Sequence, residues 1–226
     1  MSTDKPRRAN PGDGRFILGL VGRAGSGKTT VARAIAADGG ALIEADTIGH
    51  QVTDQDPEVR EALAAEYGAG VYRPDGSLDR ARVAARVFGD REARARLDRL
   101  VHPRILERIA LRLDELRRAD HRGVVVVDAA LMLDWGLERS CDAVLAVVAP
   151  ERDQVTRLTR SRGWTEAEAR ARLAAQRTNE AYAAAADGTL ENRGSVADLE
   201  RTARALVARM MAERAVLRGS ATENGC

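Results

Sequence analysis

The octapeptide G-R-A-G-S-G-K-T at residues 22–29 constrains this chain most, because it matches the phosphate-binding loop pattern G-x-x-x-x-G-K-[ST]. An apolar run at residues 16–21 precedes it and favours a buried strand, and residues 30–37 are typical of a helix. Glycines allow a backbone path that turns successive N–H groups toward one point, and the dipole of the following helix is directed at the same point. A strand, a glycine loop and a helix in this order predict a phosphate-binding site.

The pattern assigns a role to each part of this loop. The Lys28 side chain can reach the β- and γ-phosphates of a nucleotide, and the Thr29 hydroxyl can ligate Mg²⁺. A glycine-rich turn with an incidental lysine is the alternative interpretation. The candidate phosphate-binding residues share the loop and the first helical turn: Gly22, Ala24, Gly25, Ser26, Gly27, Lys28, Thr29 and Thr30.

Lysine usage supports the first interpretation. Of the 36 basic residues only Lys5 and Lys28 are lysines, and Lys5 lies near the N-terminus. The chain therefore uses arginine almost everywhere except at the position where the loop needs a lysine. A compact ammonium is not mimicked by a planar guanidinium, so this exception is what a phosphate-binding lysine would produce.

Composition excludes several classes of protein. The 226 residues are enough for one domain, or for one domain with an insert, and the net charge of +2 gives no strong electrostatic case for nucleic acid or membrane partners. The two cysteines, Cys141 and Cys226, lack metal-ligand spacing, so we expect a reducing, cytoplasmic compartment. Residues 1–14 are expected to be a disordered leader, because they contain breakers and no apolar signal-peptide core. No apolar run is long enough for a transmembrane helix.

Strands and helices alternate along the chain, which predicts an α/β fold with a doubly wound parallel sheet. The expected strands after the first are residues 41–46, 123–128, 142–148 and 188–190. Helices are expected over 47–70, 78–88, 91–100, 103–118, 151–160, 165–184 and 195–214. We therefore expect an α/β domain built around the glycine loop at residues 15–216, with a helical insert at about 51–121, a helical lid at about 151–185 and a flexible tail at 217–226.

Acidic residues end two of these strands, and ligands of such sheets bind at the carboxyl ends of strands. Asp46 is a candidate to orient or deprotonate an attacking hydroxyl, although it could also be a helix N-cap. Asp128 could hold Mg²⁺ through water, or it could cap a turn. Glu44 could bind a ribose hydroxyl or support the site from behind.

Three arginines, Arg157, Arg160 and Arg162, lie on or after the helix that follows Pro150. They are similar to a mobile lid whose guanidinium groups stabilise a transferring phosphoryl group, and a solvated arginine face is the alternative. His102, just before Pro103, is either a helix-entry residue or part of a substrate pocket.

Several segments beyond the loop resemble, in chain order, the motifs of the dephospho-coenzyme A kinase family. The resemblance extends from about residue 16 to residue 210 and rests on the I-E-A-D at 43–46, Y-G at 67–68, D-G-S-L-D-R at 75–80, V-F at 87–88, L-V-H-P at 100–103, Gln154, Arg157, Gln176, A-D at 186–187 and N-R-G-S at 192–195. The chain departs from the family pattern at Glu44, His50, Ala130 and Ser161, where the family has an aspartate, an arginine, a proline and a lid arginine.

The resemblance implies ATP-dependent phosphorylation of the ribose 3′-hydroxyl of dephospho-coenzyme A, with ATP as donor and Mg²⁺ as the metal. It implies that Asp46 is the base, that Arg157 acts at the lid, and that Asn192 and Gly194 lie against the adenine of ATP. Because Ser161 stands where the family has its second lid arginine, we expect Arg160 or Arg162 to take its place alongside Arg157. The insert would bind the acceptor through Arg80, His102 and Pro103.

Two other functions stay open at this point. One is a kinase of the same fold that acts on another nucleotide or nucleoside, and the other is a nucleotide-binding regulatory protein without transfer activity. The insert motifs argue against the first, and the intact Lys28, Thr29 and Asp46 argue against the second. We expect a monomer or a weak homo-oligomer with a small-molecule substrate.

Overall fold

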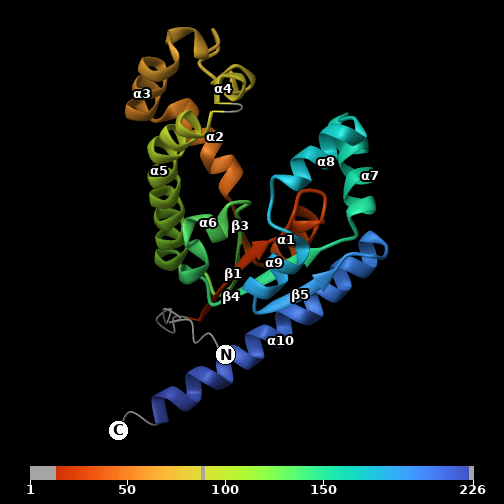
Figure 1. Ribbon diagram of the computed structural model, residues 1–226. Helices are drawn as coiled ribbons and strands as arrows, with labels where there is room; N and C mark the ends of the chain where they lie inside the picture. The colour runs from red at the N-terminus through yellow and green to blue at the C-terminus, as the bar shows by residue number, and fades with distance from the viewer. Residues whose placement is uncertain (1–13, 88–89, 224–226) are drawn as a thin grey trace. The chain divides into compact units, whose positions relative to one another are not determined.

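The computed structural model of the chain describes residues 14–87 and 90–223 (Figure 1). The predicted leader lies outside these residues except for Gly14, and so does Phe88. The described residues divide into two compact units, one formed by the parts of the chain up to Ile43 and from Asp120 onward, and one formed by residues 44–119. Each unit is described by itself.

A five-stranded sheet organises the first unit, in the order β2-β3-β1-β4-β5. The central strand β1 pairs in parallel with β3 and with β4, and β4 pairs in parallel with β5. The predicted doubly wound α/β fold is therefore confirmed. The strands are β1 (Arg15–Val21), β2 (Ala41–Glu44), β3 (Gly123–Asp128), β4 (Ala143–Val148) and β5 (Gly188–Glu191).

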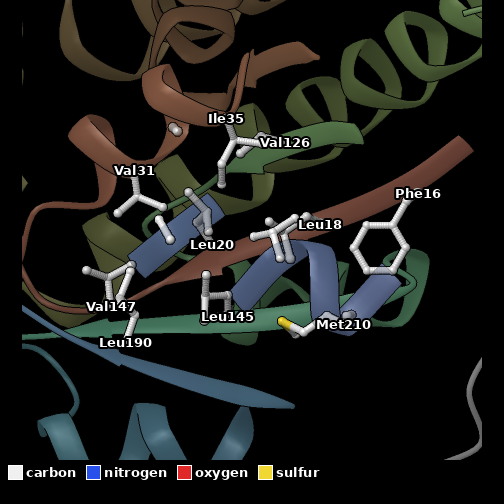
Figure 2. Packing of buried hydrophobic residues seen from close by; sticks show 14 of the residues in the cluster. Phe16, Leu18, Leu20, Val31, Ile35, Val126, Leu145, Val147, Leu190 and Met210 are labelled. Carbon is white, nitrogen blue, oxygen red and sulfur yellow. The ribbon is translucent and has the colours of Figure 1, made fainter. Parts of the chain in front are cut away.

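Strand β1 is buried along its whole length, as expected for a central strand that is covered on both faces. Leu18 and Leu20 project into the main core, which also receives side chains from α1 (Lys28–Ala37) and α10 (Val196–Glu223) (Figure 2). On the opposite face, Gly19 leaves room for Met132, since a Cβ at that glycine would lie 2.6 Å from the Met132 sulfur. Helices thus cover both faces of the sheet.

The opposite face of the sheet carries shorter helices. Helix α6 (Met132–Trp135) packs on β1, and α9 (Asn179–Ala185) packs on β4. The 3₁₀-helix η2 (Leu137–Ser140) leads into β4. We expected one helix over 165–184, but the chain forms α8 (Glu166–Ala174) and a separate α9. The separation arises at Thr178, whose side chain caps α9 by accepting a hydrogen bond from the Ala181 N–H.

Helices α7 (Glu151–Arg162) and α8 form a helical pair with its own small core. Leu158 and Leu173 are buried in it, and Ala24 of the glycine loop packs against it. The predicted capping box between Thr165 and Glu168 is confirmed at the start of α8. Because Ala24 joins this core, the α7–α8 pair is attached to the glycine loop by apolar packing.

The second unit is helical, and its long helix differs from our prediction. We expected two helices separated before Pro103, whereas α5 (Arg91–Arg118) runs through that proline. A proline removes one backbone hydrogen bond, but α5 packs along α2 and buries Ile105 and Ile109, which outweighs the loss. The other elements are α2 (Ala45–Gln55), α3 (Pro57–Tyr67), the 3₁₀-helix η1 (Ala69–Val71) and α4 (Arg80–Val87).

Two further boundaries differ from the sequence prediction. Strand β2 ends at Glu44, so Asp46 lies in the first turn of α2 instead of ending a strand. Helix α10 continues to Glu223, so most of the predicted flexible tail is helical. Within the described ranges, no helix combines the length and the apolarity that crossing a bilayer requires.

Burial in the sheet core predicts a contrast between two matched substitutions. Val126 of β3 is fully buried in the main core, and Val196 at the start of α10 is 62% exposed. We expect Val126→Ala to lower the free energy of unfolding by roughly 2 kcal/mol, because it removes buried methyl groups and leaves a cavity. Val196→Ala should change it by less than about 0.5 kcal/mol. Urea unfolding followed by circular dichroism measures both, and equal effects would contradict this core assignment.

Candidate phosphate-binding site

The glycine loop between β1 and α1 has the backbone conformation that the pattern predicts. The φ angles of Gly22, Gly25 and Gly27 are 144°, 71° and 108°, and residues other than glycine rarely adopt such positive values. A Cβ at Gly22 would also lie 2.2 Å from the carbonyl oxygen of Val147 in β4. The first glycine is therefore required both by its backbone angle and by the close approach of the neighbouring strand.

Four consecutive residues of this loop are each held by a side chain from the C-terminal half of the chain. These contacts join the loop to α7, to the segment after α8 and to the segment after β5. They are the Arg23 guanidinium to Glu151 at 3.0 Å, the Ala24 N–H to Gln176 Oε1 at 2.9 Å, Arg157 Nη1 to the Gly25 carbonyl at 3.0 Å, and Asn192 Nδ2 to the Ser26 carbonyl at 2.8 Å. The loop conformation is thus set largely from outside the loop.

Lys28 lies at the first position of α1, and its ammonium group is directed back over the loop. Lys28 Nζ donates to the carbonyl of Gly22 at 2.8 Å and to that of Arg23 at 3.3 Å. Thr29, which is exposed, and Thr30 follow in the first turn of the helix. The free N–H groups of a first turn and a nearby ammonium are together suited to bind an anion.

Arg157 and Asn192 both lie against the glycine loop. We predicted Arg157 at the lid and Asn192 beside the adenine of ATP. Besides its contact with Gly25, Arg157 donates from Nη2 to the carbonyl of Asn192 at 3.5 Å. The backbone N–H of Asn192 in turn donates to Val148 at the end of β4. Arg157 therefore joins the glycine loop to the segment after β5. Gly194 lies further along this segment, where a Cβ would come within 3.3 Å of Asp198.

The other predicted residues of the first unit occupy two places. Asp128 is the last residue of β3 and pairs in register with Leu20, so it lies at the carboxyl edge beside the strand that enters the loop. Arg160 and Arg162 lie in the last turn of α7 and are exposed. The structure therefore brings Asp128 to the expected edge of the sheet and leaves the two lid arginines on the surface.

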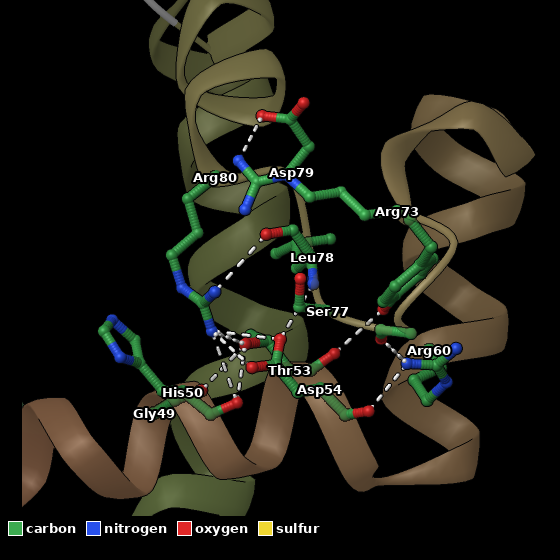
Figure 3. A network of polar contacts seen from close by, with 12 residues as sticks. Gly49, His50, Thr53, Asp54, Arg60, Arg73, Ser77, Leu78, Asp79 and Arg80 are labelled. Atoms are coloured by element: carbon green, nitrogen blue, oxygen red, sulfur yellow. Dashed lines mark hydrogen bonds and ion pairs between the residues drawn. The ribbon is translucent and has the colours of Figure 1, made fainter.

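Arg80, predicted to bind the acceptor, is the centre of a polar network in the second unit (Figure 3). Its Nη2 contacts both carboxylate oxygens of Asp54 at 3.0 Å and the Thr53 hydroxyl at 3.0 Å. Burial acts to raise the pKa of Asp54, but the Leu78 N–H and Arg80 outweigh it and hold this pKa below its usual value. Arg80, the first residue of α4, thus fixes the start of that helix to α2.

Asp46, His102 and Pro103 are the other predicted residues of the second unit. Asp46 is exposed in the first turn of α2, one residue after Ala45, where a helix N-terminus favours a carboxylate. His102 and Pro103 lie inside α5, so neither marks the start of a helix. Burial lowers the pKa of His102, and the charge of Asp98 opposes this shift in part.

Sequence reasoning missed the pairing of Arg23 with Glu151. The pattern leaves the second position of the loop unspecified, and Glu151 is separated from it by 128 positions. A charged residue within an otherwise small-residue loop was the available signal. No local rule could have supplied its partner, because the pairing depends on the placement of α7.

The family model and the curated relatives indicate the same family. A family model described as dephospho-CoA kinase matches residues 16–198. The chain is 36% identical over 196 residues to a dephospho-CoA kinase of Corynebacterium glutamicum, covering 86% of this chain and 96% of that protein. It is 42% identical over 162 residues to a dephospho-CoA kinase of Moorella thermoacetica, covering 71% of this chain and 76% of that protein. The crystal structure of TT1252 from Thermus thermophilus superimposes with a TM-score of 0.74 at 30% identity, covering 86% of this chain and 97% of that one.

The external hold on the glycine loop predicts different effects for two asparagines. Asn192 and Asn179 each donate from Nδ2 at 2.8 Å to a backbone carbonyl, Asn192 to Ser26 in the loop and Asn179 to Ala149 outside it. We expect Asn192→Ala to weaken the binding of a nucleoside triphosphate by about tenfold, because a buried carbonyl loses its partner and the loop loosens. Asn179→Ala should change it by less than about twofold. Calorimetric titration measures both affinities. Equal losses would contradict the prediction, because they would show that the contact with Ser26 contributes no more to nucleotide binding than a contact outside the loop.

Proposed function

The chain belongs to the dephospho-CoA kinase family, and on this premise we propose that it transfers the γ-phosphoryl group of ATP to the ribose 3′-hydroxyl of dephospho-coenzyme A. The observation that carries this proposal is the glycine loop with Lys28 directed over it, in a chain that matches the family from residue 16 to residue 198. The products are coenzyme A and ADP. The attacking oxygen loses its proton as the bond to phosphorus forms and the bond between the γ-phosphorus and the β,γ-bridging oxygen breaks.

The donor site consists of the glycine loop and the residues that hold it. Backbone N–H groups of the loop and of the first turn of α1 cradle the phosphates, while that of Ala24 donates to Gln176, and Lys28, whose ammonium lies over the loop, neutralises the β- and γ-phosphates. Asn192 and Gly194 support the adenine, because their segment is joined to the loop through Ser26 and Arg157. The triphosphate is thus bound at a loop whose shape is already set.

Mg²⁺ fits the oxygen donors that the first unit offers. The Thr29 hydroxyl is exposed at the start of α1, and Asp128 ends the strand beside β1. Among the residues that the structure describes, no group of three or more His, Cys, Asp or Glu side chains could hold a metal by itself. That suits an ion that retains waters and is bound mainly through phosphates. When bound, Mg²⁺ neutralises charge on the β- and γ-phosphates.

Residues of the second unit serve the acceptor in this proposal. Asp46 accepts the proton of the 3′-hydroxyl, since it offers an exposed carboxylate to a bound acceptor. Arg80, His102 and Pro103 bind or shape the acceptor pocket. Because the Arg80 guanidinium already contacts Asp54 and Thr53, we propose that it acts by holding the insert in its binding conformation.

The exposed arginines at the end of α7 serve the transferring group. Ser161 stands where the family pattern has an arginine, and Arg160 and Arg162 flank it. Long side chains at the end of a helix can shift their charged groups by several ångströms. We therefore propose that Arg160 or Arg162, alongside Arg157, supplies the positive charge that faces the transferring phosphoryl group. We further propose that the enzyme is cytoplasmic and is a monomer or a weak homo-oligomer.

A screen of hydroxyl acceptors with ATP and Mg²⁺ tests the function. We expect dephospho-coenzyme A to be phosphorylated and other nucleotides and nucleosides to react far more slowly. Lys28→Ala is the control, and it should lower turnover by at least about a hundredfold, because a preorganised charge that stabilises the transition state is lost. Lys28→Arg should not restore turnover, since the planar guanidinium does not fit the loop. A product formed on another acceptor, with dephospho-coenzyme A inert, would overturn the proposal.

Asp46→Asn separates proton transfer from donor binding. The substitution keeps the shape of the side chain and removes its basicity, so we expect turnover to fall by roughly two to four decades. The ATP dissociation constant should change by no more than a few-fold, because the glycine loop is unaltered. Calorimetry and steady-state rates measure the two quantities. A collapse of ATP affinity would instead assign Asp46 to the metal or to the fold.

A further inference from the structure

Arg23, the second residue of the glycine loop, is a buried cation with a single ion-pair partner in the part of the chain that the structure describes. The residue is 8% exposed, and Nη1 donates to Glu151 Oε2 at 3.0 Å. Its Nε is buried and has no hydrogen-bond partner among residues 14–87 and 90–223. A guanidinium removed from water needs a compensating charge, so the position of Arg23 depends on Glu151.

Glu151 divides its carboxylate between the loop and the lid. While Oε2 accepts from Arg23, Oε1 accepts from Arg170 of helix α8 at 3.2 Å. Arg170 has a second partner on its own helix, Glu166, at 2.8 Å. One carboxylate at the start of α7 therefore joins the glycine loop to α8, and the first turn of a helix is favourable for its negative charge.

The backbone of Arg23 takes part in the resting position of Lys28. Its carbonyl accepts a hydrogen bond from Lys28 Nζ, so a displaced Arg23 disturbs both the loop and its lysine. Arg23 and Glu151 also line an open depression of about 580 Å³ beside the loop. An unpaired Arg23 side chain would reach solvent through this depression and draw its backbone with it.

We propose that Glu151 is a positioning residue of the donor site, which holds Arg23 inside the protein and thereby sets the loop conformation that binds ATP. Through Arg170 the same carboxylate links the position of α8 to donor affinity. Glu151 contacts no reacting atom, so it acts on binding of the donor and hardly on the chemical step. The inference rests on the proposed donor site.

Calorimetric ATP titration of the full chain, together with steady-state kinetics, tests the proposal. We expect Glu151→Gln to weaken ATP binding by about tenfold, because a buried guanidinium loses its counter-charge. Turnover at saturating ATP should stay within about threefold of wild type, since an interaction equal in ground and transition states affects only binding. Glu166→Gln is the matched control: it removes the other carboxylate on Arg170, and it should leave both quantities unchanged.

A double variant distinguishes the positioning role from a general loss of stability. In Arg23→Met with Glu151→Gln no buried charge is left unpaired, so ATP affinity should recover most of the loss caused by Glu151→Gln alone. If Glu151→Gln fails to fold, Arg170→Gln replaces it, with an expected loss of about threefold because the carboxylate loses one of its two anchors.

Three results would overturn the inference. The first is wild-type ATP affinity in Glu151→Gln. The second is tighter ATP binding in that variant, which would make Arg23 a phosphate ligand that Glu151 restrains. The third is a double variant that binds ATP as weakly as Glu151→Gln alone. When Arg170→Gln stands in, wild-type affinity in that variant overturns it. Failure of the wild-type chain to bind ATP would overturn the proposed function instead.

Discussion

The contacts that distant side chains make with residues 23–26 are the constraint on which the glycine loop and the proposed donor site depend. A loop rich in glycine has many backbone conformations available, and selecting one of them costs more entropy than it would for other residues. Glu151, Gln176, Arg157 and Asn192 each fix one residue of this loop. Because these contacts lie within the protein itself, they order a loop whose ordering would otherwise reduce the free energy of binding.

The same contacts assign two tasks to the segment after β4. Helices α7 and α8 pack on Ala24 through a small apolar core and, at the same time, present exposed arginines near the end of α7. The base of the predicted lid therefore packs on the glycine loop, while Arg160 and Arg162 are exposed outside that core.

In the second unit an ion pair likewise holds a turn in place from a separate helix. The turn before α4 is held to helix α2 because the Leu78 N–H donates to the Asp54 carboxylate, and Arg80, the first residue of α4, contacts the same carboxylate and the Thr53 hydroxyl (Figure 3). Arg60 fastens the same turn from the other side, through the carbonyls of Asp54 and Gly76. A helical insert with short elements needs such contacts, since short helices are marginally stable alone.

Local patterns in the sequence determined the glycine loop, the buried strands, the capping box at Thr165 and the order of the α/β elements, because each depends on residues within a few positions of one another. The same patterns failed at Pro103, where packing of α5 on α2 outweighs a lost hydrogen bond, and at the end of α10, where the helix continues past the predicted tail. They predicted roles at one site for Lys28, Arg157 and Asn192, but they did not show what the latter two contact. Only the tertiary structure decided that Arg23 is buried against Glu151 and that Arg157 joins two loops, because these contacts connect residues more than a hundred positions apart or on separate elements, and the sheet order brings them together.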